Sequence, residues 1–186
     1  MRQEVRIIGG KFRGKKIFFP IAEGLRPTPN RIRETLFNWL MHVIARSRCL
    51  DLFAGSGALG FEALSRGAKE VLFLDKSLSV CNNLQNIAMT INDICYTIMH
   101  SRADHYLPTI NIPFDIIFLD PPFVKYYHME IIQLIHSSKA LINGGLLYVE
   151  SPSQLAMDTT IWQLQKIKHA GNVCYALYVY INKAIQ

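Results

Sequence analysis

The chain has 186 residues, 50% of them hydrophobic, and this size suits one domain with a sizeable core and a short appendage. Its four cysteines and six histidines show no paired metal-ligand spacing, and no apolar run reaches membrane length, which argues against a metal site and a membrane segment. Residues 1–48 hold eleven Lys and Arg against three Glu, so the net charge of +6 is concentrated near the N-terminus.

Residues 1–25 are expected to form a small basic extension in front of the main domain, residues 26–186. Short apolar runs around Gly9-Gly10 and Gly14 predict a β-hairpin here. Its charge indicates a polyanionic partner, although a solvated basic tail explains the charge equally well. The cations expected to contact phosphates are Arg6, Lys11, Arg13, Lys15 and Lys16.

A helix is expected after this extension. The prolines of Arg26-Pro-Thr-Pro favour an extended approach to it, and Asn30 is the expected N-cap. Apolar residues then recur at helical spacing between positions 32 and 44. Arg26, Arg31 and Arg33 join the candidates for contact with a polyanion.

Short apolar strands alternate with helices in the rest of the chain. Strands are expected at 49–53, 71–75, 95–100, 114–120, 145–150, 161–169 and 174–181, and helices at 58–66, 78–89 and 129–137. This alternation indicates a parallel sheet that is covered on both faces. The turn Gly171-Asn172 joins the last two strands as a hairpin, so one strand should run antiparallel.

A glycine loop, Gly55 to Gly60, follows the strand 49–53. Glycines let a ligand approach main-chain amides, and Asp75, twenty residues after Gly55, stands where a carboxylate accepts ribose hydroxyls. The spacing Gly55-x-Gly57-x-x-Gly60 also matches the dinucleotide fingerprint, so a nicotinamide or flavin enzyme stays an alternative. Asp51 favours a cofactor with cationic groups instead, because it would repel a pyrophosphate.

The motif Asp120-Pro121-Pro122-Phe123 ends the strand 114–120, where open α/β sheets bind ligands. The Asp120 carboxylate and the Pro121 carbonyl can accept both N–H groups of an exocyclic base amine and aim its lone pair at a methyl donor. Phe123 would then stack on the base. The competing explanation is a proline-rich turn with Phe123 in the core.

With these motifs the chain resembles the Rossmann-like methyltransferases, and closely the RsmD-type guanine-N2 methyltransferases of 16S ribosomal RNA. The segments that carry the resemblance are Arg6-Ile-Ile-Gly-Gly, Arg26-Pro-Thr, Arg31-Ile-Arg-Glu-Thr-Leu-Phe-Asn-Trp39, the glycine loop, Asp120-Pro-Pro-Phe123 and Leu147-Tyr-Val-Glu150. The resemblance implies an α/β, Rossmann-like methyltransferase fold. Its sheet would have seven mostly parallel strands with an antiparallel last strand.

The resemblance also implies a reaction and a set of contacts. Methyl would pass from S-adenosylmethionine to N2 of guanine 966 of 16S ribosomal RNA, within the small subunit or an assembly intermediate. Apart from the resemblance, the widely spaced cysteines and the lack of a membrane-length run fit a reducing cytoplasm, and a monomer is expected. The expected cofactor-binding residues are Asp51, Phe53, Gly55, Gly57, Asp75, Lys76 and Asp104. An exposed loop acid is an equally good explanation of Asp104. Tyr126 and Tyr127 would either stack on bases or belong to a lid or to the core.

Three alternatives remain open from the sequence. An N6-adenine methyltransferase acting on DNA or RNA shares the fold, the cofactor and the amine chemistry. A nicotinamide-dependent oxidoreductase is supported by the glycine fingerprint. A non-catalytic RNA-binding factor that has kept the fold is disfavoured by the intact Asp120-Pro-Pro-Phe123 motif.

Overall fold

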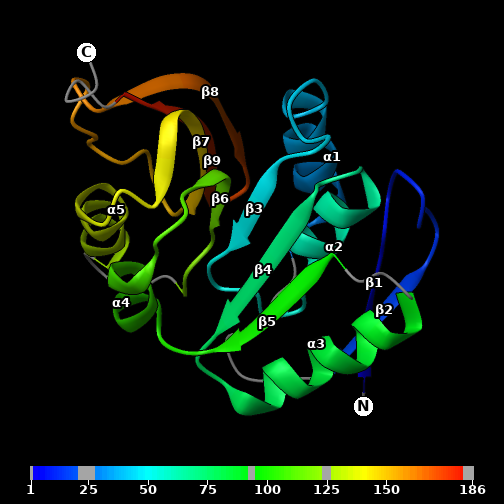
Figure 1. Cartoon of the computed structure of the whole chain (residues 1–186). Coiled ribbons are helices and arrows are strands. Elements are labelled where there is room, and N and C mark those ends of the chain that lie inside the picture. The colour runs from blue at the N-terminus through cyan, green and yellow to red at the C-terminus, as the bar shows by residue number, and fades with distance from the viewer. Residues whose placement is uncertain (1, 21–27, 92–94, 123–126, 182–186) are drawn as a thin grey trace.

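The computed structural model of the chain describes residues 2–20, 28–91, 95–122 and 127–181. Its centre is a seven-stranded sheet in the order β5-β4-β3-β6-β7-β9-β8 (Figure 1). The strands are β3 (Arg48–Asp51), β4 (Glu70–Asp75), β5 (Tyr96–His100), β6 (Phe114–Leu119), β7 (Leu141–Ser151), β8 (Trp162–Ala170) and β9 (Val173–Tyr180). The β9 strand runs antiparallel to both of its neighbours, β7 and β8, and the pairs from β5 to β7 are parallel. This confirms the predicted fold class and its reversed last strand.

Helices cover both faces of the sheet (Figure 1). They are α1 (Asn30–Trp39), α2 (Ala58–Ser65), α3 (Leu78–Ile91), α4 (Ala103–Tyr106) and α5 (Tyr127–Ser137), with a short 3-10 turn at Leu107–Thr109. The first three pack on one core and α5 packs on the other. Within the described residues, no helix is both long and apolar enough to cross a membrane.

Two helix predictions differ from the structure. The first helix ends at Trp39 rather than continuing to residue 44, although Ile44 is still buried by the turns that follow. The expected N-cap is also wrong, because Pro29 occupies that position and no side chain caps the helix. The Asn30 Oδ1 atom instead accepts a hydrogen bond from Arg33 at 2.6 Å.

The predicted N-terminal hairpin is confirmed as β1 (Arg2–Arg6) paired antiparallel with β2 (Lys16–Pro20). It packs on the body of the protein, since its apolar residues Val5, Ile7, Ile17 and Phe19 are buried in the core formed with α1, α2 and α3. The turn at Gly10 lies against the end of α2, where a Cβ atom on Gly10 would meet the Ser65 carbonyl oxygen at 1.8 Å. The expected boundary at residue 25 lies outside the described residues and stays a prediction.

Candidate active site

The carboxyl ends of three adjacent parallel strands bring the predicted motifs to one edge of the sheet. The glycine loop follows β3, and β3 lies between β4 and β6 in the sheet. The loop therefore stands between the carboxyl ends of β4 and β6. Asp51 ends β3 and pairs in register with Phe118 of β6, two residues before Asp120. Asp75 ends β4 on the other side of β3. Ligands of open α/β sheets bind at this edge, so the strand order makes it the candidate active site.

Two carboxylates hold the glycine loop in place. Gly55 and Gly57 have φ angles of 49° and 77°, in the left-handed region that favours glycine, and α2 begins directly afterwards. The Gly60 amide donates to Asp51 Oδ2 at 2.9 Å, and the Gly55 amide donates to Asp75 Oδ2 at 3.0 Å. The sequence indicated that both acids face a ligand. The structure adds that both shape the loop around it.

Asp51 is a buried acid in an electronegative site. Its side chain is almost wholly buried, and burial raises the pKa of Asp51 to about 7, with a further increase from the negative charge of Asp75. The hydrogen bond from the Gly60 amide opposes this shift in pKa. A cationic ligand would stabilise the Asp51 carboxylate, whereas a pyrophosphate would add negative charge to a site that already crowds carboxylates.

The Asp120 side chain belongs to a polar cluster that joins three distant segments. The Thr28 hydroxyl, just before α1, lies 3.4 Å from Asp120 Oδ2 and 2.9 Å from Glu150 Oε1 at the end of β7. The Tyr148 hydroxyl donates to the same Glu150 oxygen at 2.9 Å. Thr28 and Glu150 lie in two segments that carry the family resemblance, but the sequence assigned them no separate role.

Both acids of this cluster hold protons more tightly than usual. Burial raises the pKa of Asp120 well above its ordinary value, and the negative charges of Glu150 and Asp51 raise it further, against the Thr28 hydrogen bond. Burial also raises the pKa of Glu150, against hydrogen bonds from Thr28 and Tyr148. Pro121 is buried beside Asp120, and Pro122 is exposed. Phe123, the predicted stacking residue, lies outside the described residues.

Aromatic and charged side chains form the rim of the same edge. The rings of Phe53 and Tyr127 meet edge to face, with centroids 5.7 Å apart. Asp104, in the first turn of α4, makes a bidentate pair with Arg102 at 2.7 and 3.0 Å. Asp104 is therefore a half-buried helical acid rather than the exposed loop acid of the alternative explanation, and its contact with an adenine amine stays a prediction. Lys76, next to Asp75, is exposed, and its contact with the cofactor also stays a prediction.

The predicted RNA-contacting residues differ in their accessibility. Arg6, Lys11, Arg13, Lys16 and Arg31 are exposed, and Lys16 pairs with Glu4 at 2.8 Å. Lys15 is half-buried, and its ammonium group donates to the Thr90 carbonyl at the end of α3. Arg26 lies outside the described residues.

Arg33 corrects the prediction of an RNA contact. Its side chain is 0% exposed, pairs with Glu62 at 3.4 Å and donates to the Arg6 carbonyl at 2.9 Å. The guanidinium group is therefore inside the protein and cannot reach a phosphate. The sequence contains a signal for this position, because Arg33 shares the apolar helix face of Leu36 and Phe37.

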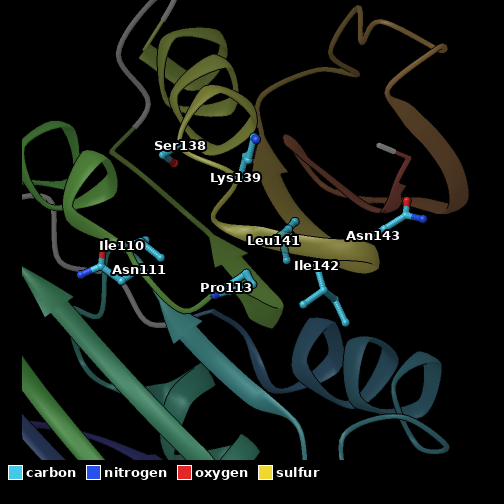
Figure 2. Close-up of a pocket in the computed structure, with 8 residues that line it drawn as sticks. All are labelled: Ile110, Asn111, Pro113, Ser138, Lys139, Leu141, Ile142 and Asn143. Atoms are coloured by element: carbon cyan, nitrogen blue, oxygen red, sulfur yellow. The ribbon is translucent and has the colours of Figure 1, made fainter. Parts of the chain in front are cut away.

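An open pocket of about 490 Å³ lies at the opposite edge of the sheet, before β6 and around the start of β7. Figure 2 shows the side chains that line it. Its lining residues are Ile110, Asn111, Pro113, Ser138, Lys139, Leu141, Ile142 and Asn143. The lining contains no carboxylate and no motif residue, so the carboxyl edge is the better candidate for chemistry.

Comparisons with known proteins show the family to which the chain is similar. The model of a family described as "Conserved hypothetical protein 95" matches residues 5–179. The Escherichia coli protein named Ribosomal RNA small subunit methyltransferase D is 42% identical over 177 residues, which cover 94% of this chain and 89% of that protein. The Haemophilus influenzae protein of the same name is 45% identical over 180 residues, with 94% and 93% covered. The solved structure of yhhF from Escherichia coli matches with a TM-score of 0.88 at 40% identity, covering 97% of this chain and 100% of that one.

Proposed function

Because the chain belongs to the family of the small-subunit ribosomal RNA methyltransferases D, we propose that it transfers methyl from S-adenosylmethionine to N2 of guanine 966 in 16S ribosomal RNA. One observation carries the proposal. The Asp120 carboxylate, followed by Pro121, lies at the same edge of the sheet as a glycine loop that is held in place by hydrogen bonds to carboxylates. The substrate in this proposal is the small subunit or an assembly intermediate. The enzyme acts as a cytoplasmic monomer without a metal.

The loop fits S-adenosylmethionine better than a dinucleotide. Two loop amides, those of Gly55 and Gly60, already donate to Asp75 and Asp51, so they are engaged before a pyrophosphate arrives. The acids Asp51, Asp75 and Asp120 meet at this edge and favour a ligand that carries an ammonium and a sulfonium group. The bound cofactor supplies a methyl group on a good leaving group, sulfonium sulfur. In this role Asp51 faces the cationic end and Asp75 the ribose.

The amine is activated by acceptors that the chain holds rigidly. The Asp120 carboxylate and the Pro121 carbonyl accept its two N–H groups, and proline fixes the backbone between them. These hydrogen bonds draw the nitrogen out of conjugation with the ring and point its lone pair at the methyl group. The Asp120 charge also stabilises the positive charge that develops on nitrogen. Phe123 stacks on the base, as the motif predicts.

Methyl transfer to defined substrates tests the proposal. The chain is incubated with labelled S-adenosylmethionine and with small subunits that lack the modification, and the methylated nucleoside is identified by mass. We expect N2-methylguanosine at position 966. Methylated adenosine would favour the N6-adenine alternative, and absence of transfer from an otherwise folded chain that binds S-adenosylhomocysteine would favour a non-catalytic RNA-binding factor.

One variant tests the role of Asp120 in the same assay. Asp120→Ala should bind S-adenosylhomocysteine within a few-fold of the wild type, and its single-turnover rate should fall by a factor on the order of 10²–10³. Asp158→Ala, at an exposed acid in the loop before β8, is the matched control. Turnover of Asp120→Ala close to that of the control would contradict the assignment. Calorimetry with NAD in place of S-adenosylhomocysteine tests the oxidoreductase alternative.

A further inference from the structure

The hydroxyl group of Thr28 lies between two carboxyl groups from different strands. Its oxygen is 2.9 Å from Glu150 Oε1 and 3.4 Å from Asp120 Oδ2. Thr28 and Glu150 are 4% and 3% exposed, so bulk water has little access to them. Asp120 is half-buried and is the least buried of the three residues.

Methyl transfer to an amine leaves one proton too many on the nitrogen. The new N–C bond uses the lone pair, and the electrons of the broken C–S bond stay on sulfur. The nitrogen must then lose a proton, and Asp120 is the acceptor that the proposed function places beside it. A protonated Asp120 lacks the charge that stabilises the amine of the next substrate.

We propose that Thr28 and Glu150 form a proton relay that removes this proton from Asp120, an inference that rests on the proposed function. Asp120 passes its proton to Thr28 Oγ1, while the Thr28 hydroxyl proton moves to Glu150 Oε1. One O–H bond breaks and one forms at Thr28, so its hydroxyl is unchanged. Asp120 is again a carboxylate, and Glu150 is a neutral acid.

The direction of the hydrogen bonds favours this order of transfer. While Asp120 is ionised, the Thr28 hydroxyl lies within donating distance of both carboxylates, 2.9 Å from Glu150 Oε1 and 3.4 Å from Asp120 Oδ2. Once Asp120 is protonated, the single Thr28 proton stays with Glu150, and the lone pairs of Thr28 Oγ1 accept from Asp120. Tyr148 donates a second hydrogen bond to the same Glu150 oxygen, so Glu150 enters the reaction as an acceptor.

The groups around the relay keep the proton inside the cluster. Asp120 faces Glu150 on β7 and Asp51 on β3, and the negative charges of both raise the pKa of Asp120. On the far side of Glu150, Tyr148 faces Tyr175 of β9, and His128 of α5 is 2.9 Å from the Glu150 carbonyl. Burial raises the pKa of Glu150, which suits a transient proton store. After the product leaves, the proton returns to solvent.

Two substitutions with opposite electrostatic effects test the relay. Thr28→Val keeps the shape of the side chain and removes the hydroxyl, and Glu150→Gln removes the acceptor charge. Because the relay restores Asp120 after methyl transfer, each should lower the steady-state rate by roughly 10²-fold. Without the Thr28 hydrogen bond the pKa of Asp120 rises, so the acid limb of the pH–rate profile should move to higher pH in Thr28→Val. Without the Glu150 charge that limb should move to lower pH.

A purely structural role would lower the rates and leave the acid limb in place. Thr28→Ser, which keeps the hydroxyl, should rescue the wild-type pH profile. Unmoved profiles in Thr28→Val and Glu150→Gln, with the wild type making N2-methylguanosine, would overturn the relay and leave the proposed function intact. No product from the wild type would instead overturn the proposed function. If Thr28→Val does not fold, the rate of Glu150→Gln decides, and a steady-state rate close to that of the wild type would overturn the relay.

Discussion

The guanidinium group of Arg33 and the carboxylate of Glu62 form an ion pair inside the protein, with Nη1 and Oε2 3.4 Å apart and both side chains 0% exposed. Glu62, on α2, also accepts hydrogen bonds from the Ile8 and Gly9 amides at 2.8 and 2.9 Å and from Arg66 at 2.7 Å. One carboxylate therefore connects the N-terminal hairpin, α1 and the helix that follows the glycine loop.

Removing this carboxylate should destabilise the whole chain. Glu62→Ala leaves Arg33 buried without its counter-charge, which costs about 3–5 kcal/mol in the free energy of unfolding. Denaturant unfolding measures the difference. Glu70→Ala is the matched control, because Glu70 pairs with Arg48 at a partly exposed site and should cost about 0–1 kcal/mol. Equal destabilisation in the two variants would show that the Glu62 network does not stabilise the fold.

The exposed cations of the hairpin should set the salt dependence of RNA binding. Replacing Lys11, Arg13 and Lys16 by Gln should weaken binding and lower the slope of log affinity against log salt by about 0.7–0.9 for each phosphate that the variant no longer neutralises. The control replaces Lys166 and Lys168, which are exposed on the edge strand β8, far from the hairpin (Figure 1). Lys15 is left in place because it bonds to α3. An unchanged slope in the hairpin variant would exclude the hairpin from the interface.

Asp51 should make the protein without cofactor less stable as the pH rises toward neutrality. Burial raises the pKa of Asp51 to about 7, whereas an unfolded aspartate has a pKa of about 4. Between these values the folded state keeps a proton that the unfolded state has released. The contribution is therefore fully present below about pH 4, falls by about 1.4 kcal/mol per pH unit and is lost above about pH 7.

Asp51→Asn should remove this share of the pH dependence, because an amide oxygen still accepts the Gly60 amide but does not titrate. Denaturant unfolding of the wild type and the variant at intervals from pH 4 to pH 8 measures the difference in free energy. The free energy of unfolding of Asp51→Asn should rise relative to that of the wild type as the pH increases across this range. Parallel curves would contradict the raised pKa.

Gly60 should be intolerant of a larger side chain because α2 packs closely on β4. A Cβ atom at position 60 would lie 2.2 Å from the Phe73 ring. Gly60→Ala should therefore cost about 1–3 kcal/mol by overpacking, partly offset by about 1 kcal/mol of helix propensity. Adding Phe73→Leu should recover part of this stability, and thermal unfolding of the single and double variants measures the coupling. Strictly additive effects would show that the Phe73 ring does not limit position 60.

The sequence by itself determined the class of fold and the edge of the sheet at which the predicted motifs meet. The positions of strands and helices follow from local hydrophobic periodicity. The glycine loop and Asp120-Pro121 can be recognised in the sequence because glycine and proline favour particular backbone geometries. The carboxyl ends of neighbouring parallel strands meet at one edge, so the predicted order of elements brought these motifs together. The missed four-residue helix α4 is too short to show a period.

Only the tertiary structure decided which side chains become partners. From the sequence Arg33 is expected to be a surface cation, yet in the fold it is buried and paired with Glu62. The Thr28 hydroxyl donates to the carboxylate of Glu150 on β7, 122 positions away in the sequence. Local patterns set the direction of the backbone and of each side chain. The hydrogen-bond partners of a buried polar group depend on how distant segments pack, and the cost of leaving such a group unpaired selects those partners.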